Sequence, residues 1–373
     1  MKKKAKILLI TPNLKGISDG VNRIQPSLGL MLIAPILEKH GHEVKIYDAA
    51  LDGWEKRKII DEKNNIVMIG QDDENIAKVV SNFSPDIVAL SVLFSNLLES
   101  AHQIAKVIKK VNKKITVILG GNHISSAVQD YKFFKIEKEL KKNNVIIDLE
   151  NDHFDYGMAG EGEFSLLKMV EAILNNDDNE IMKVPGLVKR LSRGEYHINP
   201  NHRVHDLNLL PRPARHLVDM EAYFKIGAFH SAKSRSKRVL SVMCSRGCPE
   251  KCTFCSTPSM WGQNTRWRST NHIMEEIAND VRDFKIGEIQ FDDDTITVNK
   301  KNLYSLCDEL EKVGLPWCTP NGTKVNYHFR QQNEMYKRMY ESGCYQITLA
   351  CESGVQRVLD DIINKRLPID TIY

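Results

Sequence analysis

The feature that most constrains the fold is the alternation of short apolar runs with segments of helical periodicity. In the first half, the apolar runs cover residues 7–10, 44–47, 87–92 and 115–119. Between the last two runs, apolar residues recur along one helical face from 97 to 111. Short apolar runs that alternate with helices are typical of a parallel sheet buried on both faces. We therefore expect an α/β first domain.

Three segments of the first half are less regular. Residues 28–40 predict a helix that Gly41 ends, although Pro35 inside it predicts a kink or a late start. Residues 50–85 are polar and weakly periodic, and they predict only a helix near 74–83. A hairpin is expected around 192–195.

The second half restarts the alternation. The expected strands are 238–243, 288–291, a run near Trp317, and 346–350, and the expected helices are 273–284, 303–313, 334–341 and one that begins at Gln356. These elements make about four βα units, and an eightfold barrel does not fit in the residues that remain. We therefore expect a partial (β/α) barrel. Either the protein has only a partial barrel or the chain is a piece of a longer protein.

Length and composition set the domain organisation and exclude some classes. The 373 residues suffice for two or three domains, which we place at 1–175 and 236–373 with a connector at 176–235. The 52 Lys and Arg against 48 Asp and Glu give a net charge of +4, which does not indicate a nucleic-acid-binding protein. The first apolar run is too short for a signal peptide, and no apolar stretch is long enough for a membrane span. We expect a cytoplasmic protein.

All eight cysteines lie beyond residue 243, and three of them form the cluster Cys248, Cys252 and Cys255. The cluster directly follows the apolar run 238–243, at the carboxyl end of the first strand of a βα series, where such folds place their active sites. In a reducing cytoplasm a tight cysteine cluster indicates metal binding more than disulfide bonds. Three thiolates can hold a four-iron cluster with one iron open to an exogenous ligand.

Structural zinc, with Cys244 as the fourth ligand, is the alternative. Zinc sites usually join two separated pairs of ligands, whereas these cysteines all lie within twelve residues and Cys244 falls where the strand should still be running. The remaining cysteines, Cys307, Cys318, Cys344 and Cys351, lack ligand spacing and are expected to be buried.

The CxxxCxxC array, with Phe254 just before its last cysteine, resembles the signature of the radical S-adenosylmethionine (SAM) superfamily. The resemblance implies a [4Fe-4S] cluster on Cys248, Cys252 and Cys255, with Phe254 among the cofactor-binding residues. It also implies that the open iron chelates SAM, and that one electron from the reduced cluster cleaves SAM to methionine and a 5'-deoxyadenosyl radical.

Two further motifs extend the resemblance. FDDDTIT ends the second strand of the series, where the superfamily contacts the SAM amino group, which implies that role for Asp292, Asp293 and Asp294. An acidic triplet at a strand end could instead be a helix cap or a solvated turn. The ESG tripeptide after the fourth strand implies that Glu352 and Ser353 lie near the SAM ribose and carboxylate. The later strands that normally help to hold adenine are missing from these residues.

Parallel sheets bind ligands beyond the carboxyl ends of their strands, near the switch point of the strand order. The candidate ligand-binding residues in those loops of the first half are Thr11, Pro12, Ser91, Gly120, Gly121, Gly160 and Glu161. The first half contains the segments PSLGL, EKHGHEVKIYDA, DIVALSV, ILGGNH and GEGEFSLL, and the linker LNLLPRPARHLVD follows it. Through these segments the first half resembles the Rossmann-like (flavodoxin-like) cobalamin (B12)-binding domain that precedes a radical SAM domain in one large class. The DxHxxG element that supplies cobalt with a histidine elsewhere is missing, so the lower ligand stays open. His123 is expected to be a hydrogen-bonding group.

The resemblance identifies the chain as a cobalamin-dependent radical SAM enzyme and implies a methyltransferase that acts on an unactivated carbon or phosphinate centre. One SAM would methylate cob(I)alamin, and a second would supply the radical that abstracts a substrate hydrogen before methyl transfer. A radical cyclase or rearrangement enzyme is the related alternative, and a zinc-stabilised ligand-binding or regulatory module is the alternative from another class. Methylthiotransferases are excluded because the first half has no cysteine for their second cluster.

The expected partners are a small-molecule or natural-product-like substrate and an electron donor of the flavodoxin or ferredoxin type. No membrane span and no nucleic acid are expected. The sequence does not indicate which substrate is used, nor the oligomeric state.

Overall fold

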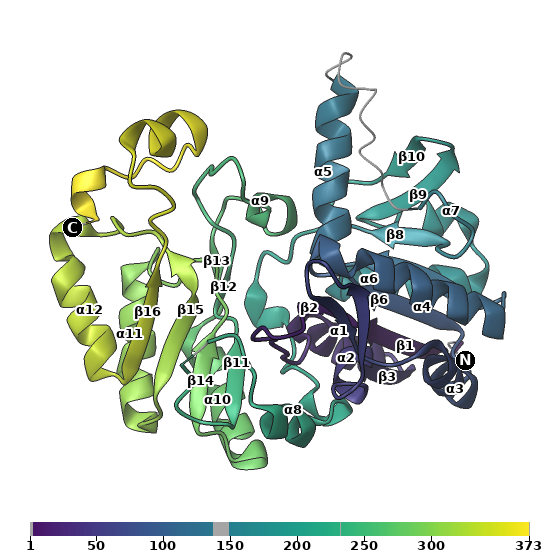
Figure 1. Cartoon of the computed structure of the whole chain (residues 1–373), viewed down its shortest axis with the longest axis horizontal. Coiled ribbons are helices and arrows are strands. Elements are labelled where there is room, and N and C mark those ends of the chain that lie inside the picture. Colours follow the sequence, from purple (N-terminus) through teal and green to yellow (C-terminus); the bar gives the residue numbers. More distant parts are fainter. Residues whose placement is uncertain (1–2, 137–148, 232, 373) are drawn as a thin grey trace. The chain divides into compact units, whose positions relative to one another are not determined.

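The computed structural model describes residues 3–136, 149–231 and 233–372. The chain divides into two units, of which unit 1 comprises Met1–Arg203 with Pro211–Met220 and unit 2 comprises Val204–Leu210 with Glu221–Tyr373. Each unit has its own parallel sheet, coloured from purple to teal in unit 1 and from green to yellow in unit 2 in Figure 1. The residues expected to form the connector are shared between the two units.

Unit 1 contains a seven-stranded sheet in the order β10-β9-β8-β7-β6-β1-β3. Its strands are β1 (Lys6–Thr11), β3 (Glu43–Asp48), β6 (Ile87–Ser91), β7 (Thr116–Gly120), β8 (Tyr156–Met158), β9 (Leu187–Ser192) and β10 (Glu195–Ile198). The first five are parallel, and β9 and β10 form the expected hairpin. Numbered along the chain, the parallel strands follow the order 2-1-3-4-5, which is the flavodoxin-like order with its switch point between β1 and β6. The predicted fold of the first domain is confirmed.

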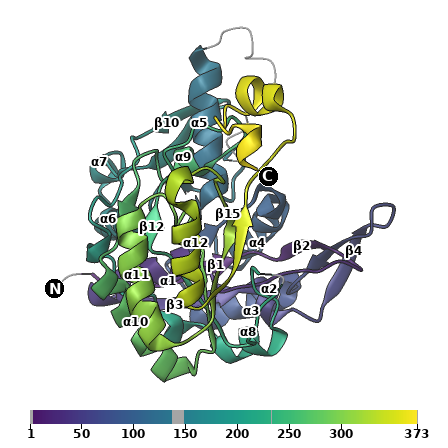
Figure 2. The same cartoon turned by 90° about the vertical axis from the view of Figure 1, so that its left-hand side faces the viewer.

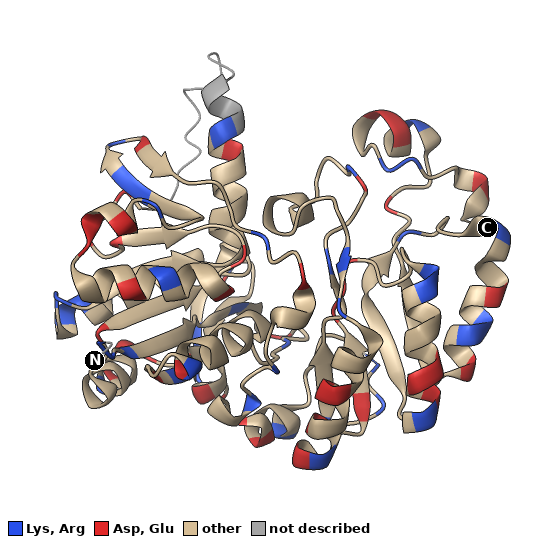
Figure 3. Cartoon of the chain, turned by 180° about the vertical axis from the view of Figure 1, so that it is seen from behind, with Lys and Arg blue, Asp and Glu red and all other residues tan. Residues whose placement is uncertain are grey.

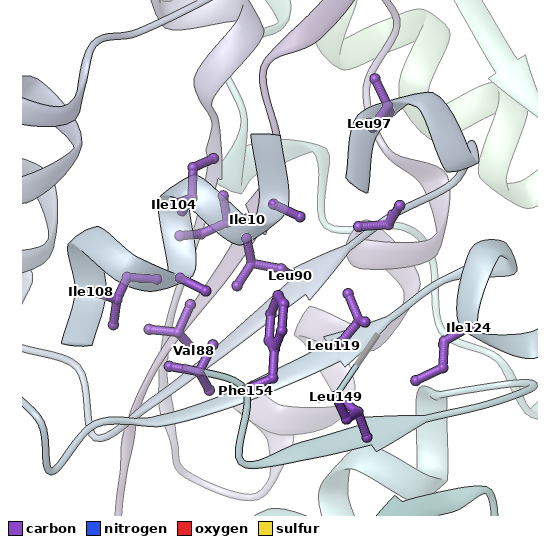
Figure 4. Packing of buried hydrophobic residues seen from close by; sticks show 14 of the residues in the cluster. Ile10, Val88, Leu90, Leu97, Ile104, Ile108, Leu119, Ile124, Leu149 and Phe154 are labelled. Carbon is purple, nitrogen blue, oxygen red and sulfur yellow. The ribbon is translucent and has the colours of Figure 1, made fainter. Parts of the chain in front are cut away.

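Helices cover both faces of this sheet. On one face lie α3 (Asp73–Phe83) and α4 (Leu98–Val111), and on the other α1 (Leu28–Lys39) and α6 (Glu163–Asn175). Along β1, Leu8 and Ile10 pack under the first pair of helices, while Ile7 and Leu9 pack under the second, because side chains alternate along a strand. Figure 4 shows Ile104 and Ile108 of α4 packed with the strand residues. Burial on both faces explains why the strands are continuously apolar.

Helix α1 contradicts one detail of the prediction, because it begins at Leu28 and continues through Pro35 without a late start. Proline has no N–H to donate to the carbonyl of Met31, one turn earlier. The N–H of Ala214 donates to that carbonyl instead, with an N···O distance of 2.8 Å. A residue distant in sequence therefore satisfies the carbonyl that the proline leaves without its usual partner.

A small antiparallel sheet of β2 (Leu14–Ile17), β5 (Ile66–Ile69) and β4 (Arg57–Asp61) was not expected. The helix predicted near 74–83 is confirmed as α3, but the polar stretch before it forms two of these strands. Most of β4 is exposed and carries charged residues, so its sequence lacks the alternation that marks a half-buried strand. The remaining helices of unit 1 are α2 (Ala49–Asp52), α5 (Asn122–Ile136) and α7 (Asp178–Ile181).

Unit 2 contains four parallel strands in the order β11-β14-β15-β16. They are β11 (Val239–Val242), β14 (Glu288–Phe291), β15 (Trp317–Thr323) and β16 (Cys344–Leu349), and the helices between them are α10 (Thr270–Phe284), α11 (Lys300–Val313) and α12 (Gln332–Glu341). Neighbouring helices pack side by side, as Figure 2 shows. The expected series of four βα units is confirmed for these strands and helices. Two short helices, α8 (Met220–Ile226) and α9 (Thr257–Met260), complete the unit.

Two expectations in unit 2 need correction. The helix expected from Gln356 does begin there, but it is short and irregular: Gln356 and Arg357 are α-helical, and Val358–Ile362 form a π-helical turn. The residues that follow leave the helical path, and Ile363 bonds the cysteine loop. Cys351 is half-buried and not fully buried as expected, whereas Cys307, Cys318 and Cys344 lie in the interior. Cys351 differs because it follows the edge strand β16 and packs only beside a small apolar cluster.

Figure 3 shows acidic and basic residues interspersed along the helices of both units. Among the residues that the structure describes, no helix combines the length and the apolar character required to cross a membrane.

Candidate functional site

The cysteine loop starts just beyond β11. The chain leaves that strand through β12 (Ser245–Arg246), which pairs antiparallel with β13 (Arg266–Trp267). Gly247 follows with φ +95°, and a Cβ atom there would lie 2.5 Å from the carbonyl oxygen of Asn264. Glycine fits this position because it has no Cβ and tolerates positive φ. The short hairpin therefore closes the two ends of the loop that carries the three thiols.

The three predicted cluster ligands lie in this loop, with Cys248 and Cys252 half-buried and Cys255 exposed. Burial raises the pKa of the Cys248 thiol to about 11, and it also raises the pKa of Cys252. The charge of Cys255 raises both pKa values further. The positive charges of Lys365 and Lys324 partly offset this rise in the pKa of Cys252. The three thiols belong to one loop, within eight consecutive residues.

The donor set fits an iron–sulfur cluster. Thiolates hold such clusters, and each cysteine binds a different iron, so the thiols need to be near one another but not to converge on one point. Within the described parts of the chain, no three His, Cys, Asp or Glu side chains converge closely enough to hold a single metal ion. Cys244, the fourth ligand in the zinc alternative, is fully buried, and burial raises the pKa of its thiol well above its ordinary value.

Asp292, Asp293 and Asp294 directly follow β14, and each has a different environment. Asp293 is the most buried of the three, with 1% of its surface exposed. Its carboxylate accepts hydrogen bonds from the backbone N–H groups of Cys244 and Ser245, at 3.0 and 2.6 Å, and from the Ser245 hydroxyl. Burial raises the pKa of Asp293 to about 7. Asp293 therefore fixes the end of β11 from which the cysteine loop departs.

Asp292 and Asp294 each have a polar contact of their own. The Nδ1 atom of His230 lies 3.2 Å from Asp292 Oδ1. The hydroxyl of Thr257 donates to Asp294 Oδ1 at 3.1 Å, and burial raises the pKa of Asp294. The charge of Asp294 also raises the pKa of Cys248, so this acid faces the cysteine loop.

Glu352 and Ser353 of the ESG motif make contacts within their own segment, and Phe254 is exposed. Glu352 has φ +62°, and its carboxylate accepts a hydrogen bond from Lys365 Nζ at 2.9 Å. The Ser353 hydroxyl accepts from the backbone N–H of Val355 at 3.1 Å, which closes a turn. Phe254 is 60% exposed on the cysteine loop. Nothing in these contacts tests the SAM-binding roles expected for these residues, which stay predictions.

Sequence reasoning missed three residues of this site, Glu250, Lys324 and Lys365. Glu250, between the first two cysteines, accepts hydrogen bonds from Lys324 Nζ at 2.9 Å and from the Tyr327 hydroxyl at 2.8 Å. Lys365 is the third, and its segment bonds the loop through Thr253, whose N–H donates to the carbonyl of Ile363 at 3.0 Å. These partners are far apart in sequence, so no local spacing could have shown them.

The predicted ligand-binding residues of unit 1 gather along the carboxyl edge of its sheet. Thr11 ends β1, Ser91 ends β6 and Gly120 ends β7. Ser91 pairs in register with Gly120, and Ile10 pairs with Leu90, so Thr11, Ser91 and Gly120 stand at one level of three adjacent strands. This level spans the switch point, where parallel sheets of this order bind their ligands.

Thr11 also carries an open hydrogen-bonding group. Within the described part of the chain, its buried hydroxyl has no hydrogen-bond partner. A buried polar group without a partner is rare, and a ligand is one of its explanations. Pro12, next in the loop, is buried. The edge therefore includes a buried hydroxyl for which the described residues supply no partner.

Two glycines shape the rest of this edge. Gly121 has φ +102°, and a Cβ there would lie 2.5 Å from a backbone carbonyl oxygen. Gly160 has φ +85° after β8, and Glu161 beside it is 2% exposed. The His123 Nδ1 atom lies 2.8 Å from the hydroxyl of Ser95, in agreement with the expected hydrogen-bonding role.

Family models match both units. The model described as the B12 binding domain matches residues 15–136, and the model described as the radical SAM superfamily matches residues 242–372. A curated relative, the cytidylyl-2-hydroxyethylphosphonate methyltransferase of Streptomyces wedmorensis, is 32% identical over 386 residues, an alignment that covers 98% of this chain and 68% of the relative.

Solved structures show the same fold. The cobalamin-dependent S-adenosylmethionine radical enzyme OxsB, with aqua-cobalamin bound, gives a TM-score of 0.70 at 17% identity over 98% of this chain and 46% of that one. The radical S-adenosylmethionine methyltransferase TsrM from Kitasatospora setae, with tryptophan and a SAM analog bound, gives 0.64 at 16% identity over 95% and 60%. The chain thus spans about half of these structures and about two thirds of the curated relative.

Proposed function

The chain belongs to the family of cobalamin-dependent radical SAM enzymes, and from this premise we propose that it methylates an unactivated carbon or phosphinate centre of a small molecule. Its cofactors are those of the family, a [4Fe-4S] cluster, SAM and cobalamin. The observation that carries the proposal is the 32% identity to a methyltransferase along 98% of the chain. Because the alignment runs through both units, it includes the cysteine loop and the switch-point edge together.

In the proposed site, Cys248, Cys252 and Cys255 hold the cluster. When bound, the cluster supplies the electron that cleaves SAM, and cobalamin carries the methyl group. The loop keeps its three thiols together because Gly247 permits the turn and the β12–β13 hairpin closes it. Since the loop offers no fourth cysteine, one iron stays open for SAM.

Asp292 and Asp294 are the acids that we propose for the SAM amino group. A carboxylate attracts an ammonium group through charge-assisted hydrogen bonds. Asp293 acts differently, because its oxygens already accept bonds from Cys244 and Ser245 and hold the loop in place. Glu352 and Ser353 stay proposed contacts of the ribose and carboxylate of SAM, with Phe254 beside the cluster.

For cobalamin, we propose the edge formed by Thr11, Ser91 and Gly120. Support comes from their common level at the switch point and from the buried Thr11 hydroxyl. Proposed contacts in the flanking loops are Pro12, Gly121, Gly160 and Glu161.

The alternatives are weaker. A radical cyclase would use the same cofactors, but the curated relative that matches nearly the whole chain is named a methyltransferase. Membership of the radical SAM superfamily sets the zinc-stabilised module aside. The partners that we propose are a small-molecule substrate and a flavodoxin or ferredoxin that supplies electrons. A cytoplasmic location stays a prediction, since thiolate ligands need a reducing compartment.

The first test is cofactor retention. The chain is reconstituted without oxygen with iron, sulfide and hydroxocobalamin, desalted, and analysed for iron and for the visible spectrum of cobalamin. We expect about four irons per chain, as a four-iron cluster requires, together with stoichiometric cobalamin, and loss of the iron alone in Cys252→Ala. A colourless protein with one zinc would refute the proposal.

Methyl transfer is tested with SAM that carries a deuterated methyl group, a chemical reductant and candidate phosphonate or carbon substrates. Mass spectrometry should show 5'-deoxyadenosine and S-adenosylhomocysteine together with a deuterated product. If a Cys252→Ala chain still produced 5'-deoxyadenosine, the assignment of the cluster ligands would be wrong.

A further inference from the structure

Two nearly buried lysines flank the cysteine loop. Lys324 donates to Glu250 at 2.9 Å, and Lys365 donates to Glu352 at 2.9 Å. The side chains of Lys324 and Lys365 are only 11% and 6% exposed. Lysine is rarely buried unless its charge is paired, and each of these lysines has a glutamate partner. The two ion pairs therefore place paired charges beside the cysteine loop.

Glu250 connects the first pair to the thiols. It stands between Cys248 and Cys252 in sequence, and its second carboxylate oxygen accepts from the Tyr327 hydroxyl at 2.8 Å. Lys324 follows β15, so the ion pair joins the loop to the neighbouring sheet. Both side chains are mostly buried, so solvent screens their charges only weakly.

The segment after the π-helical turn holds the second pair in place. The N–H and the hydroxyl of Thr253 donate to the carbonyls of Ile363 and Ile362, at 3.0 and 2.7 Å. Asn364 Nδ2 donates to the carbonyl of Lys251 at 3.3 Å. Because residues 362–364 are bonded to Thr253 and Lys251, the next residue, Lys365, lies beside the cysteine loop.

We propose that Lys324 and Lys365 are positioning residues that set the reduction potential of the cluster. The inference rests on the proposed function, because it concerns the cluster held by the three cysteines. A reduced cluster carries one more negative charge than an oxidised one, and nearby charges are among the factors that determine its potential. The two ammonium groups stabilise the reduced form, while the carboxylate of Glu250 opposes them. The potential therefore depends on the balance within each ion pair.

A double-variant cycle on the first pair tests this. Reconstituted wild type, Lys324→Gln, Glu250→Gln and the double variant are titrated with reductant, and the reduced cluster is followed by electron paramagnetic resonance. In Lys324→Gln we expect the equilibrium constant for one-electron reduction to fall at least tenfold, a shift of about 59 mV toward negative potential. Glu250→Gln should shift it in the positive direction, and the double variant should return close to the wild type.

Control variants separate charge from structure. Lys324→Arg keeps the charge and should keep the potential, and Lys301→Gln, which removes an exposed charge on α11, should change nothing. Lys365→Gln should repeat the negative shift through the second pair. Iron content reports whether each variant still binds the cluster.

Each outcome decides the proposal. If Lys324→Gln binds four irons but keeps the wild-type potential, or if the double variant is shifted as far as the single one, the inference is overturned and the proposed function stands. A wild-type chain that takes up no iron overturns the proposed function and this inference with it.

Discussion

The dependence of stability on pH gives a direct measure of the burial of Asp293. Its pKa is raised from an ordinary 3.8 to about 7, because burial disfavours the charged carboxylate. The folded chain therefore keeps this proton up to about pH 7, whereas the unfolded chain releases it near pH 4. The stabilisation that this retained proton contributes is fully present below the pKa of Asp293 in the unfolded chain. It is lost as the pH rises through the pKa in the folded chain, about 7.

The size of the effect follows from the shift. One pKa unit corresponds to about 1.4 kcal/mol, so a shift of about three units lowers the free energy of unfolding by about 4 kcal/mol over the whole window. Between pH 5 and pH 7 the expected loss is about 2 kcal/mol, because Asp293 is already about half ionised in the folded chain at pH 7. Asp293→Asn cannot titrate, so it should lack this slope. Its amide also cannot accept from both Cys244 and Ser245, which should cost about 1–3 kcal/mol at low pH.

The assay is urea unfolding of the reduced, iron-free chain at pH 5, 6, 7 and 8. Tryptophan fluorescence reports mainly on unit 2, which holds three of the four tryptophans, including the fully buried Trp317. The control is Asp361→Asn, which changes an exposed acid and should keep the wild-type slope. Parallel curves of unfolding free energy against pH for wild type and Asp293→Asn would refute the reasoning.

Three further changes test separate contacts. Gly247→Ala should strain the turn by about 1–3 kcal/mol and reduce the iron bound after reconstitution, whereas Gly314→Ala, with positive φ but open space, should not reduce it. Thr11→Val should stabilise the chain by about 1 kcal/mol in urea unfolding and lower cobalamin retention; unchanged retention would remove Thr11 from the cobalamin site. Ala214→Pro suits the φ of −74° at that position, so it should remove only the hydrogen bond to Met31 and lower the stability of unit 1 by about 1–3 kcal/mol.

The strands and helices of both sheets could be predicted because their periodicity is local. The run of β14 was predicted from residue 288 to residue 291, and the structure has the same bounds. The strand β4 could not be found, since most of its side chains are exposed and charged, so its own sequence shows no apolar alternation. The continuity of α1 depends on Ala214, a contact that no reading of residues 28–40 contains.

In the candidate site too, the residues that share a local spacing could be predicted, whereas the contacts between distant segments could not. The cysteines were found because a cluster needs several thiols on one short loop, and that spacing is visible in the sequence. The different environments of Asp292, Asp293 and Asp294 were not visible, because they depend on which side of a strand end each side chain takes. Lys324 and Glu250 are 74 residues apart, and only the fold brings them together.

The bonds between the cysteine loop and the segment after the π-helical turn also affect the order of assembly during synthesis. Thr253 and Ile362 are separated by 109 residues. At a synthesis rate of about 5–20 residues per second, the later segment emerges roughly 5–20 s after the cysteines. During that interval the nascent loop lacks these bonds, so only contacts with the earlier part of the chain can restrain it.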